Sequence, residues 1–232
     1  MANTRKVALI TGANKGIGFE MARQLGKAGV TVALAARDPQ KGEAAAAALR
    51  GEGLDVQFLK LDVTKSEDYP AAAAALEQKF GGLDILINNA GINGADLHGT
   101  FETNFFAQVA LTDALLPLLK KSAAGRIVNM SSILGSQTLH SDPKSPIYDF
   151  KSLAYDASKT ALNSFTIHLA YDLKDTKIKV NSAHPGWVKT DMGGDGAPME
   201  IPEGGKTGVE LALLGEDGPT GGFFHLGQTL PW

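Results

Sequence analysis

The 232-residue sequence contains no cysteine and no excess of basic residues. Without cysteine the chain can form no disulfide, thiolate metal site or iron–sulfur cluster, and it has no cysteine nucleophile. Against 25 aspartates and glutamates stand 22 lysines and arginines, which leaves a formal net charge of −3. This balance provides no electrostatic footprint for nucleic acid or a membrane surface. The first apolar run, Val7–Ile10, is too short for a signal peptide or a membrane-spanning helix.

Motifs for metal sites and for the P-loop of nucleoside-triphosphate-binding proteins are also missing. The five histidines have no partner at i+3 or i+4 spacing, so no metal site is expected. Gly205-Lys206-Thr207 resembles the end of a phosphate-binding loop, but Glu200 stands where its first glycine is required. We therefore expect a cytoplasmic protein with one domain, residues 1–232, and a small molecule as its partner.

Apolar segments of strand length alternate with longer amphipathic or alanine-rich segments. The expected strands are Lys6–Ile10, Val30–Ala36, Asp55–Lys60, Leu83–Asn88, Gly125–Met130, Ile178–Ala183 and Gly222–Phe224. The expected helices are Ile17–Ala28, Gln40–Arg50, Glu67–Phe80, Phe101–Lys121 and Ala154–Leu173. This alternation predicts right-handed βαβ units, and the almost continuously apolar strands predict a sheet buried on both faces. We expect an α/β fold with one Rossmann-type, doubly wound parallel sheet of about seven strands, in the order 3-2-1-4-5-6-7. A β/α barrel would need a longer chain.

Two proline-containing segments, Gln137–Lys151 and Gly193–Gly205, show no strand or helix pattern. We expect both to be mobile loops on the substrate side of the domain, because loops on a rigid scaffold often form substrate walls. The segments expected to select the substrate are Gly91–Gly99, Gln137–Lys151 and Trp187–Gly205.

A glycine-rich turn, Thr11–Gly18, joins the first expected strand to the first expected helix. Its spacing is G-x-x-x-G-x-G rather than the more common G-x-G-x-x-G. Glycines here permit a tight turn and let backbone amides approach a pyrophosphate at the helix N-terminus. A dinucleotide is therefore the expected ligand.

The residues after the second expected strand indicate which dinucleotide. Arg37 comes first, at the position where an arginine accommodates the 2′-phosphate of NADP. Lys15 offers a second cation beside the glycine turn, and two cations converging on one dianion favour NADP(H). The alternative is that both cations are solvated and that Asp38 binds the ribose of NAD.

Tyr155 and Lys159 stand four residues apart near the start of an expected helix and therefore share one of its faces. A cation one turn away, with an oxidised nicotinamide, favours the phenolate and brings a tyrosine into a useful pKa range. By itself, Y-x-x-x-K is a common chance pattern. Ser131 and Ser132 end the fifth expected strand, where a hydroxyl could donate to a carbonyl oxygen or cap a turn.

The order of these motifs resembles the short-chain dehydrogenase/reductase family over essentially the whole chain. The supporting motifs are Thr11–Gly18, Asp62-Val63, Asn88-Asn89-Ala90-Gly91, Asn104, Ser132, Tyr155 with Lys159, and Pro185-Gly186. Four segments are similar to the carbonyl-reductase subgroup of this family. They are Asn14–Gly18, Ala36–Asp38, Pro185–Met192 and the terminal Trp232. That subgroup reduces ketones, aldehydes and quinones with NADPH.

The resemblance implies roles for individual residues. Tyr155 would protonate the carbonyl oxygen as hydride arrives from C4 of the nicotinamide, while Ser132 would orient that oxygen. Ser132 is preferred to Ser131 because Gly135 follows at the family's S-x-x-G spacing. Lys159 would bind the nicotinamide ribose and lower the pKa of Tyr155, and Asn104 would hold a water that links Lys159 to solvent. The implied cofactor-binding residues include Tyr155 and Lys159. The others are Gly12, Asn14, Lys15, Gly16, Ile17, Gly18, Arg37, Asp62, Val63, Asn89, Ala90, Gly91, Pro185, Gly186, Val188 and Thr190.

One feature departs from the usual family pattern: Tyr155 follows Ser132 by 23 residues rather than by about a dozen. Carbonyl reductases also lengthen this segment, and a long insertion there can mask the helical surface used for dimerisation. The sequence therefore leaves the oligomeric state undecided between a monomer, a homodimer and a homotetramer. The segment contains a second phenol, Tyr148, but Lys151 follows it by three residues, before the helix begins.

Two other functions are alternatives to a carbonyl reductase. A catalytically silent NADP(H)-binding redox sensor would be expected to lose one of the four catalytic residues, and all four are present. An epimerase or dehydratase of the longer family branch would need a larger sugar-binding region than the residues after Asp191 provide. The sequence therefore favours an NADPH-dependent carbonyl reductase.

Overall fold

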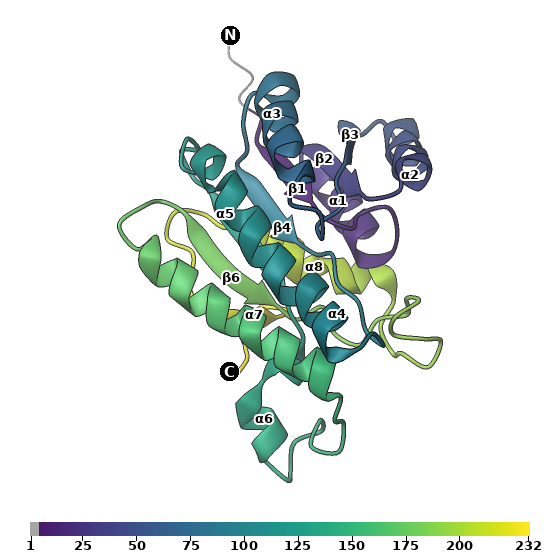
Figure 1. Cartoon of the computed structure of the whole chain (residues 1–232), viewed down its shortest axis with the longest axis vertical. Coiled ribbons are helices and arrows are strands. Elements are labelled where there is room, and N and C mark those ends of the chain that lie inside the picture. The colour runs from purple at the N-terminus through teal and green to yellow at the C-terminus, as the bar shows by residue number, and fades with distance from the viewer. Residues whose placement is uncertain (1–4) are drawn as a thin grey trace.

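In the computed structural model, which describes residues 5–232, eight strands form one sheet with helices on both faces (Figure 1). The strand order is β3-β2-β1-β4-β5-β6-β7-β8, and all neighbouring strands up to β7 pair in parallel. The strands are β1 (Val7–Ile10), β2 (Thr31–Ala36), β3 (Val56–Lys60), β4 (Ile85–Asn88), β5 (Arg126–Met130), β6 (Lys179–Ala183), β7 (Phe223–His225) and β8 (Gln228–Thr229). The predicted α/β class and the order of its seven strands are confirmed.

Helices cover the two faces of the sheet in separate layers, each with its own core. The helical elements are α1 (Gly16–Lys27), α2 (Pro39–Gly51), α3 (Asp68–Phe80), α4 (Leu97–Phe101), the π-helical turn η1 (Glu102–Phe106), α5 (Ala107–Leu119), the 3₁₀ turn η2 (Ile133–Gly135), α6 (Gln137–Ser141), α7 (Leu153–Asp172) and α8 (Ile201–Ala212). In Figure 1, α3, α5 and α7 lie in front of the sheet and α8 lies behind it. Successive side chains of a strand point to opposite faces. Accordingly, Leu9 packs into the core beneath α3, α5 and α7, while Ile10 packs into the core beneath α1, α2 and α8.

The eighth strand was not predicted. β8 pairs antiparallel with β7 through a tight turn formed by Leu226 and Gly227, which both have positive φ, at 45° and 77°. Two consecutive residues with positive φ are the requirement of a type I′ hairpin turn, whose twist matches the paired strands. A leucine in such a turn is uncommon, which explains why the sequence did not signal a hairpin.

Three predictions of local structure were wrong in part. The expected helix Phe101–Lys121 is divided among α4, η1 and α5, and the widened turn η1 contains Asn104. The expected loop Gln137–Lys151 contains the short helix α6, whose first turn is capped by the hydroxyl of Ser136. The expected loop Gly193–Gly205 ends early, because α8 begins at Ile201.

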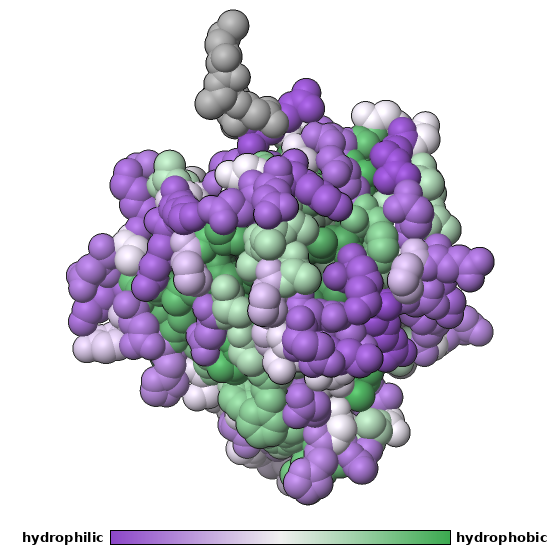
Figure 2. All heavy atoms as spheres, turned by 45° about the horizontal axis from the view of Figure 1, so that its top comes forward, coloured by the Kyte–Doolittle hydropathy of each residue, from purple (hydrophilic) through white to green (hydrophobic). Residues whose placement is uncertain are grey.

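Most of the face shown in Figure 2 is covered by hydrophilic residues, with hydrophobic residues visible between them and towards the lower part. Among the exposed apolar side chains are Phe106 of η1 and Leu153 of α7, which are 54% and 77% exposed. Of the helices in residues 5–232, none combines the length and the apolar character needed to cross a membrane.

Candidate active site

The residues predicted for the site lie in the loops and helix starts that follow the carboxyl ends of the parallel strands, which meet at one edge of the sheet. Gly12, Asn14, Lys15, Gly16, Ile17 and Gly18 follow β1; Arg37 follows β2; Asp62 and Val63 follow β3; Asn89, Ala90 and Gly91 follow β4; Asn104 lies in η1; Ser132 follows β5; Tyr155 and Lys159 lie in α7; and Pro185, Gly186, Val188 and Thr190 follow β6. This edge is where open α/β sheets bind ligands.

Hydrogen bonds fasten the loop after β1 to the loop after β4. The hydroxyl oxygen of Thr11 accepts from the backbone amides of Asn89 and Ala90, both at 2.9 Å. The side-chain amide of Asn89 donates back to the carbonyl of Thr11 at 2.8 Å. Gly18 packs against this junction: a Cβ there would lie 2.5 Å from Asn89 Nδ2 and 2.9 Å from the carbonyl oxygen of Gly12. A side chain at position 18 would therefore push the two loops apart.

The N-terminus of α1 has the properties of an anion site. Lys15 at its N-cap makes no side-chain capping bond, and the first turn of the helix contains no acidic residue. The first amides of a helix have no partner within the helix, and the helix dipole adds partial positive charge there. These amides fit a dinucleotide pyrophosphate.

The end of β2 separates the roles of Arg37 and Asp38. Arg37 is exposed at the first position after the strand. Asp38 is the N-cap of α2, and its carboxylate accepts from the amide of Lys41 at 3.1 Å. Because this carboxylate already has a structural function, the arrangement weighs against the alternative in which Asp38 binds the ribose. After β3, Asp62 accepts from both the amide and the hydroxyl of Thr64.

Lys15 lies at the N-cap of α1, beside the glycine turn, and its ammonium is paired with a carboxylate. Its ammonium lies 2.5 Å from a carboxylate oxygen of Asp191, in the loop that follows β6, and both side chains are largely exposed. The hydrogen bond and charge of Lys15 lower the pKa of Asp191 below its ordinary value. This ion pair joins segments 176 residues apart, so sequence spacing contained no sign of it.

Tyr155, Lys159 and Ser132 come together where α7 meets the end of β5. The ammonium of Lys159 donates to the carbonyl of Met130 at 2.9 Å and lies 5.6 Å from the centre of the Tyr155 ring. Gly135 permits this approach, because a Cβ there would lie 2.9 Å from the carbonyl carbon of Lys159. Ser132 and Lys159 are 7% and 5% exposed, so water has little access to either residue.

Burial decides the proton affinities of this group. It raises the pKa of Tyr155 to about 12; hydrogen bonding with Ser132 opposes the rise, and the charge of Asp156 adds to it. Burial also lowers the pKa of Lys159 to about 8, since the desolvated ammonium is disfavoured. In the protein without cofactor the pKa of Tyr155 is therefore raised. The predicted lowering requires the oxidised nicotinamide as well as the cation of Lys159, and it stays a prediction. At neutral pH Tyr155 is a phenol, the form that can donate a proton.

Asn104 is buried, and its side chain forms hydrogen bonds with Ile92 and Ser158. Its side-chain oxygen accepts from the amide of Ile92 at 2.8 Å, and its side-chain nitrogen donates to the carbonyl of Ile92 and to the hydroxyl of Ser158. Ser158 in turn donates to the carbonyl of Tyr155 at 2.7 Å. Asn104 is thus tied to the helix turn that carries Tyr155 through Ser158, a residue that the sequence did not single out.

Tyr148 and Ser131, the alternatives to Tyr155 and Ser132, lie in positions that fit the proton-donating site less well. Tyr148 is 38% exposed, and its ring faces the ammonium of Lys151 at 4.9 Å. Ser131 is buried, and its hydroxyl is directed to the carbonyl of Lys159 at 3.5 Å. Neither arrangement pairs a half-buried phenol with a buried cation as Tyr155 and Lys159 do.

His184, at the end of β6, helps to hold the turn that follows Ser132. Its Nδ1 accepts from the amides of Ile133 at 3.2 Å and Gly186 at 3.4 Å. Burial and the neighbouring His225 lower the pKa of His184 to about 3, so the imidazole stays neutral and can accept. Its position before Pro185 suggested nearness to the cofactor, but only the fold shows what the ring contacts.

Comparison with known proteins gives a consistent picture. The family model described as short chain dehydrogenase matches residues 6–200. Carbonyl reductase (NADPH) 1 from Mus musculus is 35% identical, with the whole of both chains covered. The crystal structure of NADPH-bound carbonyl reductase from chicken fatty liver superposes with a TM-score of 0.86 at 30% identity, covering 98% of this chain and 99% of that one. Salutaridine reductase from Papaver somniferum superposes with a TM-score of 0.84 at 30% identity, covering 96% and 100%.

Proposed function

Because this chain belongs to the short-chain dehydrogenase family, we propose that it is an NADPH-dependent carbonyl reductase that uses Tyr155 as its general acid. Its substrate class is a small ketone, aldehyde, dicarbonyl or quinone, and its expected location is the cytoplasm. The observation that carries the proposal is the grouping of the half-buried Tyr155 with the buried Lys159 and Ser132 at the carboxyl edge of the sheet.

The cofactor end of the site fits NADPH. The uncapped N-terminus of α1 presents amides to a pyrophosphate, Gly18 lets the loops after β1 and β4 pack together beside it, and Arg37 supplies an exposed guanidinium for a 2′-phosphate. Asp62 and Val63 would flank the adenine, Asn89 to Gly91 would line the ribose, and the backbone after Pro185 would meet the nicotinamide. When bound, the cofactor supplies hydride from C4 of its nicotinamide ring.

The chain's own residues supply the proton and hold the substrate. Tyr155, protonated at neutral pH, donates its phenolic proton to the carbonyl oxygen as negative charge develops there. Ser132 accepts from the amide of Leu134 at 3.2 Å, which leaves its own hydroxyl proton free to donate to the same oxygen. Lys159 binds the ribose and, as a cation 5.6 Å from the ring, stabilises the phenolate left after proton transfer. Asn104 would hold a water that returns a proton from solvent.

A silent NADP(H)-binding redox sensor is the alternative, and Tyr155→Phe separates the two. We expect wild-type protein to oxidise NADPH with members of a panel of α-dicarbonyls, quinones, aromatic aldehydes and ketoesters. Tyr155→Phe should lower kcat by about 100- to 10,000-fold, the usual range for a general acid, and leave NADPH binding unchanged. Tyr171→Phe, which changes an exposed tyrosine farther along α7, should retain wild-type turnover. NADPH binding without turnover of any panel member would favour the sensor, and full activity in Tyr155→Phe would exclude Tyr155 as the acid.

A further inference from the structure

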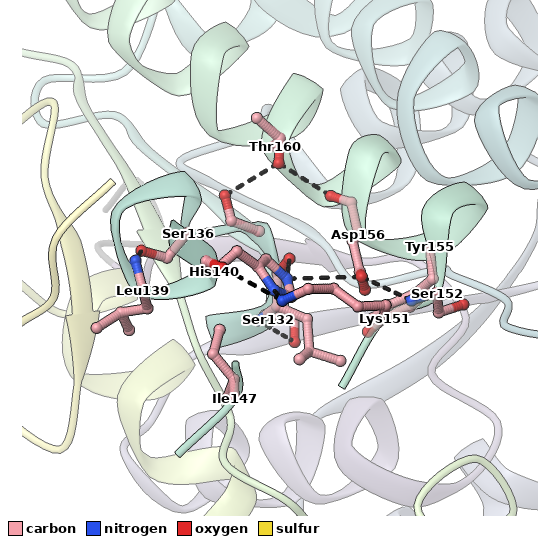
Figure 3. Close-up of polar contacts among 12 residues, drawn as sticks. Ser132, Ser136, Leu139, His140, Ile147, Lys151, Ser152, Tyr155, Asp156 and Thr160 are labelled. Carbon is pink, nitrogen blue, oxygen red and sulfur yellow. Dashed lines mark hydrogen bonds and ion pairs between the residues drawn. The ribbon is translucent and has the colours of Figure 1, made fainter. Parts of the chain in front are cut away.

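A cluster of three ionisable side chains lies beside Ser132 and Tyr155: His140, Lys151 and Asp156 (Figure 3). His140 is in α6, within the long segment between Ser132 and Tyr155, and Asp156 directly follows Tyr155 in α7. The side chains of His140 and Asp156 are 9% and 10% exposed. Buried ionisable groups are costly unless they are paired, so this cluster requires a physical explanation.

The contacts of His140 define its tautomer. Its Nδ1 lies 3.1 Å from the ammonium of Lys151, which can only donate, so Nδ1 must be the accepting nitrogen. The ring proton of neutral His140 is therefore on Nε2. That nitrogen lies 2.8 Å from the carbonyl oxygen of Leu134 and 3.5 Å from a carboxylate oxygen of Asp156. One N–H thus faces both the turn that follows Ser132 and the residue that follows Tyr155.

Leu134 connects this imidazole to the hydroxyl of Ser132. The amide of Leu134 donates to Ser132 Oγ at 3.2 Å, and the carbonyl of the same residue accepts from His140. The direction of the Ser132 hydroxyl therefore depends on the placement of Leu134, which depends on His140. In Figure 3 the imidazole of His140 lies between Lys151 and Asp156, with Ser132 close by.

Asp156 is held at one oxygen and unsatisfied at the other. Its Oδ2 accepts from the amide of Ser152 at 2.8 Å, whereas its buried Oδ1 has no hydrogen-bond partner within residues 5–232. The charged and titratable groups around this carboxylate are His140, Lys151 through the imidazole, and Tyr155. The carboxylate thus caps the start of α7 through Oδ2, while its buried Oδ1 keeps an unused capacity to accept a hydrogen bond.

We propose that His140 and Asp156 are positioning residues, which fix the turn bearing Ser132 against the helix turn bearing Tyr155 so that both hydroxyls address one carbonyl oxygen. This inference rests on the proposed carbonyl reduction. The carboxylate has a second effect: its charge raises the pKa of Tyr155, which keeps the phenol protonated for donation. The long segment after Ser132 thereby acquires a role in the reaction, since it brings His140 to the site.

Steady-state kinetics with His140→Ala, His140→Gln, Asp156→Asn and the control His168→Ala test this. His168 is an exposed histidine on α7 outside the cluster. With a carbonyl compound that the wild type reduces, His140→Ala should lower kcat about 10- to 100-fold, because small misplacements of reacting groups have effects of this size. NADPH affinity should stay within twofold. His140→Gln retains an N–H donor of similar reach, and it should recover most of the lost kcat.

Asp156→Asn provides a readout that a purely structural role would not change. The substitution removes the negative charge that raises the pKa of Tyr155, while the asparagine oxygen can still accept from the amide of Ser152. The pKa of Tyr155 should fall, so the alkaline limb of the kcat–pH profile should move to lower pH. In the double variant His140→Ala/Asp156→Asn, the loss of kcat should be smaller than the product of the two single losses, because both act through one contact.

Three outcomes overturn the inference while the proposed function stands: kcat of His140→Ala within twofold of His168→Ala, equal losses in folded His140→Ala and His140→Gln, or an unmoved pH profile in Asp156→Asn. If His140→Ala does not fold, His140→Gln and Asp156→Asn decide the question by the same criteria. If the wild type binds NADPH but turns over no carbonyl compound, the proposed function fails and this inference fails with it.

Discussion

Replacing Arg37 with alanine tests whether the end of β2 selects NADPH over NADH. Arg37 is exposed directly after the strand, while the carboxylate of Asp38 is engaged as the N-cap of α2. The guanidinium is therefore the group at this position that is available to a 2′-phosphate. NADH lacks that phosphate, so the substitution should distinguish the two cofactors.

The size of the effect follows from the contact that is lost. A hydrogen bond to a charged group contributes about 1.5–3 kcal/mol. At about 1.4 kcal/mol for each factor of ten, the KM for NADPH should rise about 10- to 100-fold, whereas that for NADH should change less than about twofold. Lys15→Ala should cost less than Arg37→Ala, because Lys15 must first leave its ion pair with Asp191. Asp191→Asn should lower the KM for NADPH slightly, since it releases Lys15.

The assay follows the oxidation of NADPH and NADH at a fixed carbonyl concentration for wild type, Arg37→Ala and Lys27→Ala. Lys27→Ala is the control, since it removes one positive charge from the last turn of α1, at the end away from the glycine turn. An equal rise in KM for both cofactors in Arg37→Ala would refute the 2′-phosphate assignment. A rise in the KM for NADPH in Asp191→Asn would refute the competition between Asp191 and the phosphate for Lys15.

Two further predictions concern stability. Gly18→Ala should lower the free energy of unfolding by about 1–3 kcal/mol and weaken NADPH binding, because its Cβ would lie 2.5 Å from Asn89 Nδ2. The control is Gly51→Ala, because no atom lies within 4 Å of a Cβ at Gly51. Its free energy of unfolding in urea should be unchanged or higher by up to ~1 kcal/mol. An equal loss of stability in both variants would contradict the packing argument. The pKa of Lys159 is about 8 in the folded protein and 10.5 in the unfolded chain. Above pH 8 the unfolded state therefore retains a proton that the folded state has lost. Because the unfolded state binds more protons there, the free energy of unfolding should rise with pH. The full rise in the free energy of unfolding is roughly 3 kcal/mol. Urea denaturation at about pH 7 and about pH 9.5 should show part of this rise in the wild type and none of it in Lys159→Met. The same pH dependence in both proteins would refute the contribution of Lys159.

The order of elements was predictable because strand and helix periodicities are local properties of the sequence. The strands from β1 to β7 were expected close to their observed positions, and α7 begins one residue before its predicted start. Parallel pairing places the carboxyl ends of these strands at one edge, so motifs at those ends could be assigned to one site before any contact was known.

Helix α8 was not predicted because its sequence argues against a helix. It contains Gly204, Gly205 and Gly208, and glycine is a poor helix former. The reason for these glycines is tertiary: a Cβ at Gly204 would lie 2.6 Å from Val188 Cγ2, and one at Gly208 would lie 2.4 Å from Met21 Sδ. Close packing against α1 and the loop after β6 outweighs the local preference.

The sequence by itself determined the fold class, the strand order and the residue types at the carboxyl edge, because each depends on periodicity or on short spacings such as that of Tyr155 and Lys159. Only the tertiary structure decided the partners of these residues. It pairs Lys15 with Asp191, places His140 against both Leu134 and Asp156, and raises the pKa of Tyr155 by desolvation. The physical reason is that burial and contacts between distant segments depend on how the loops pack, and that packing is not a local property of the chain.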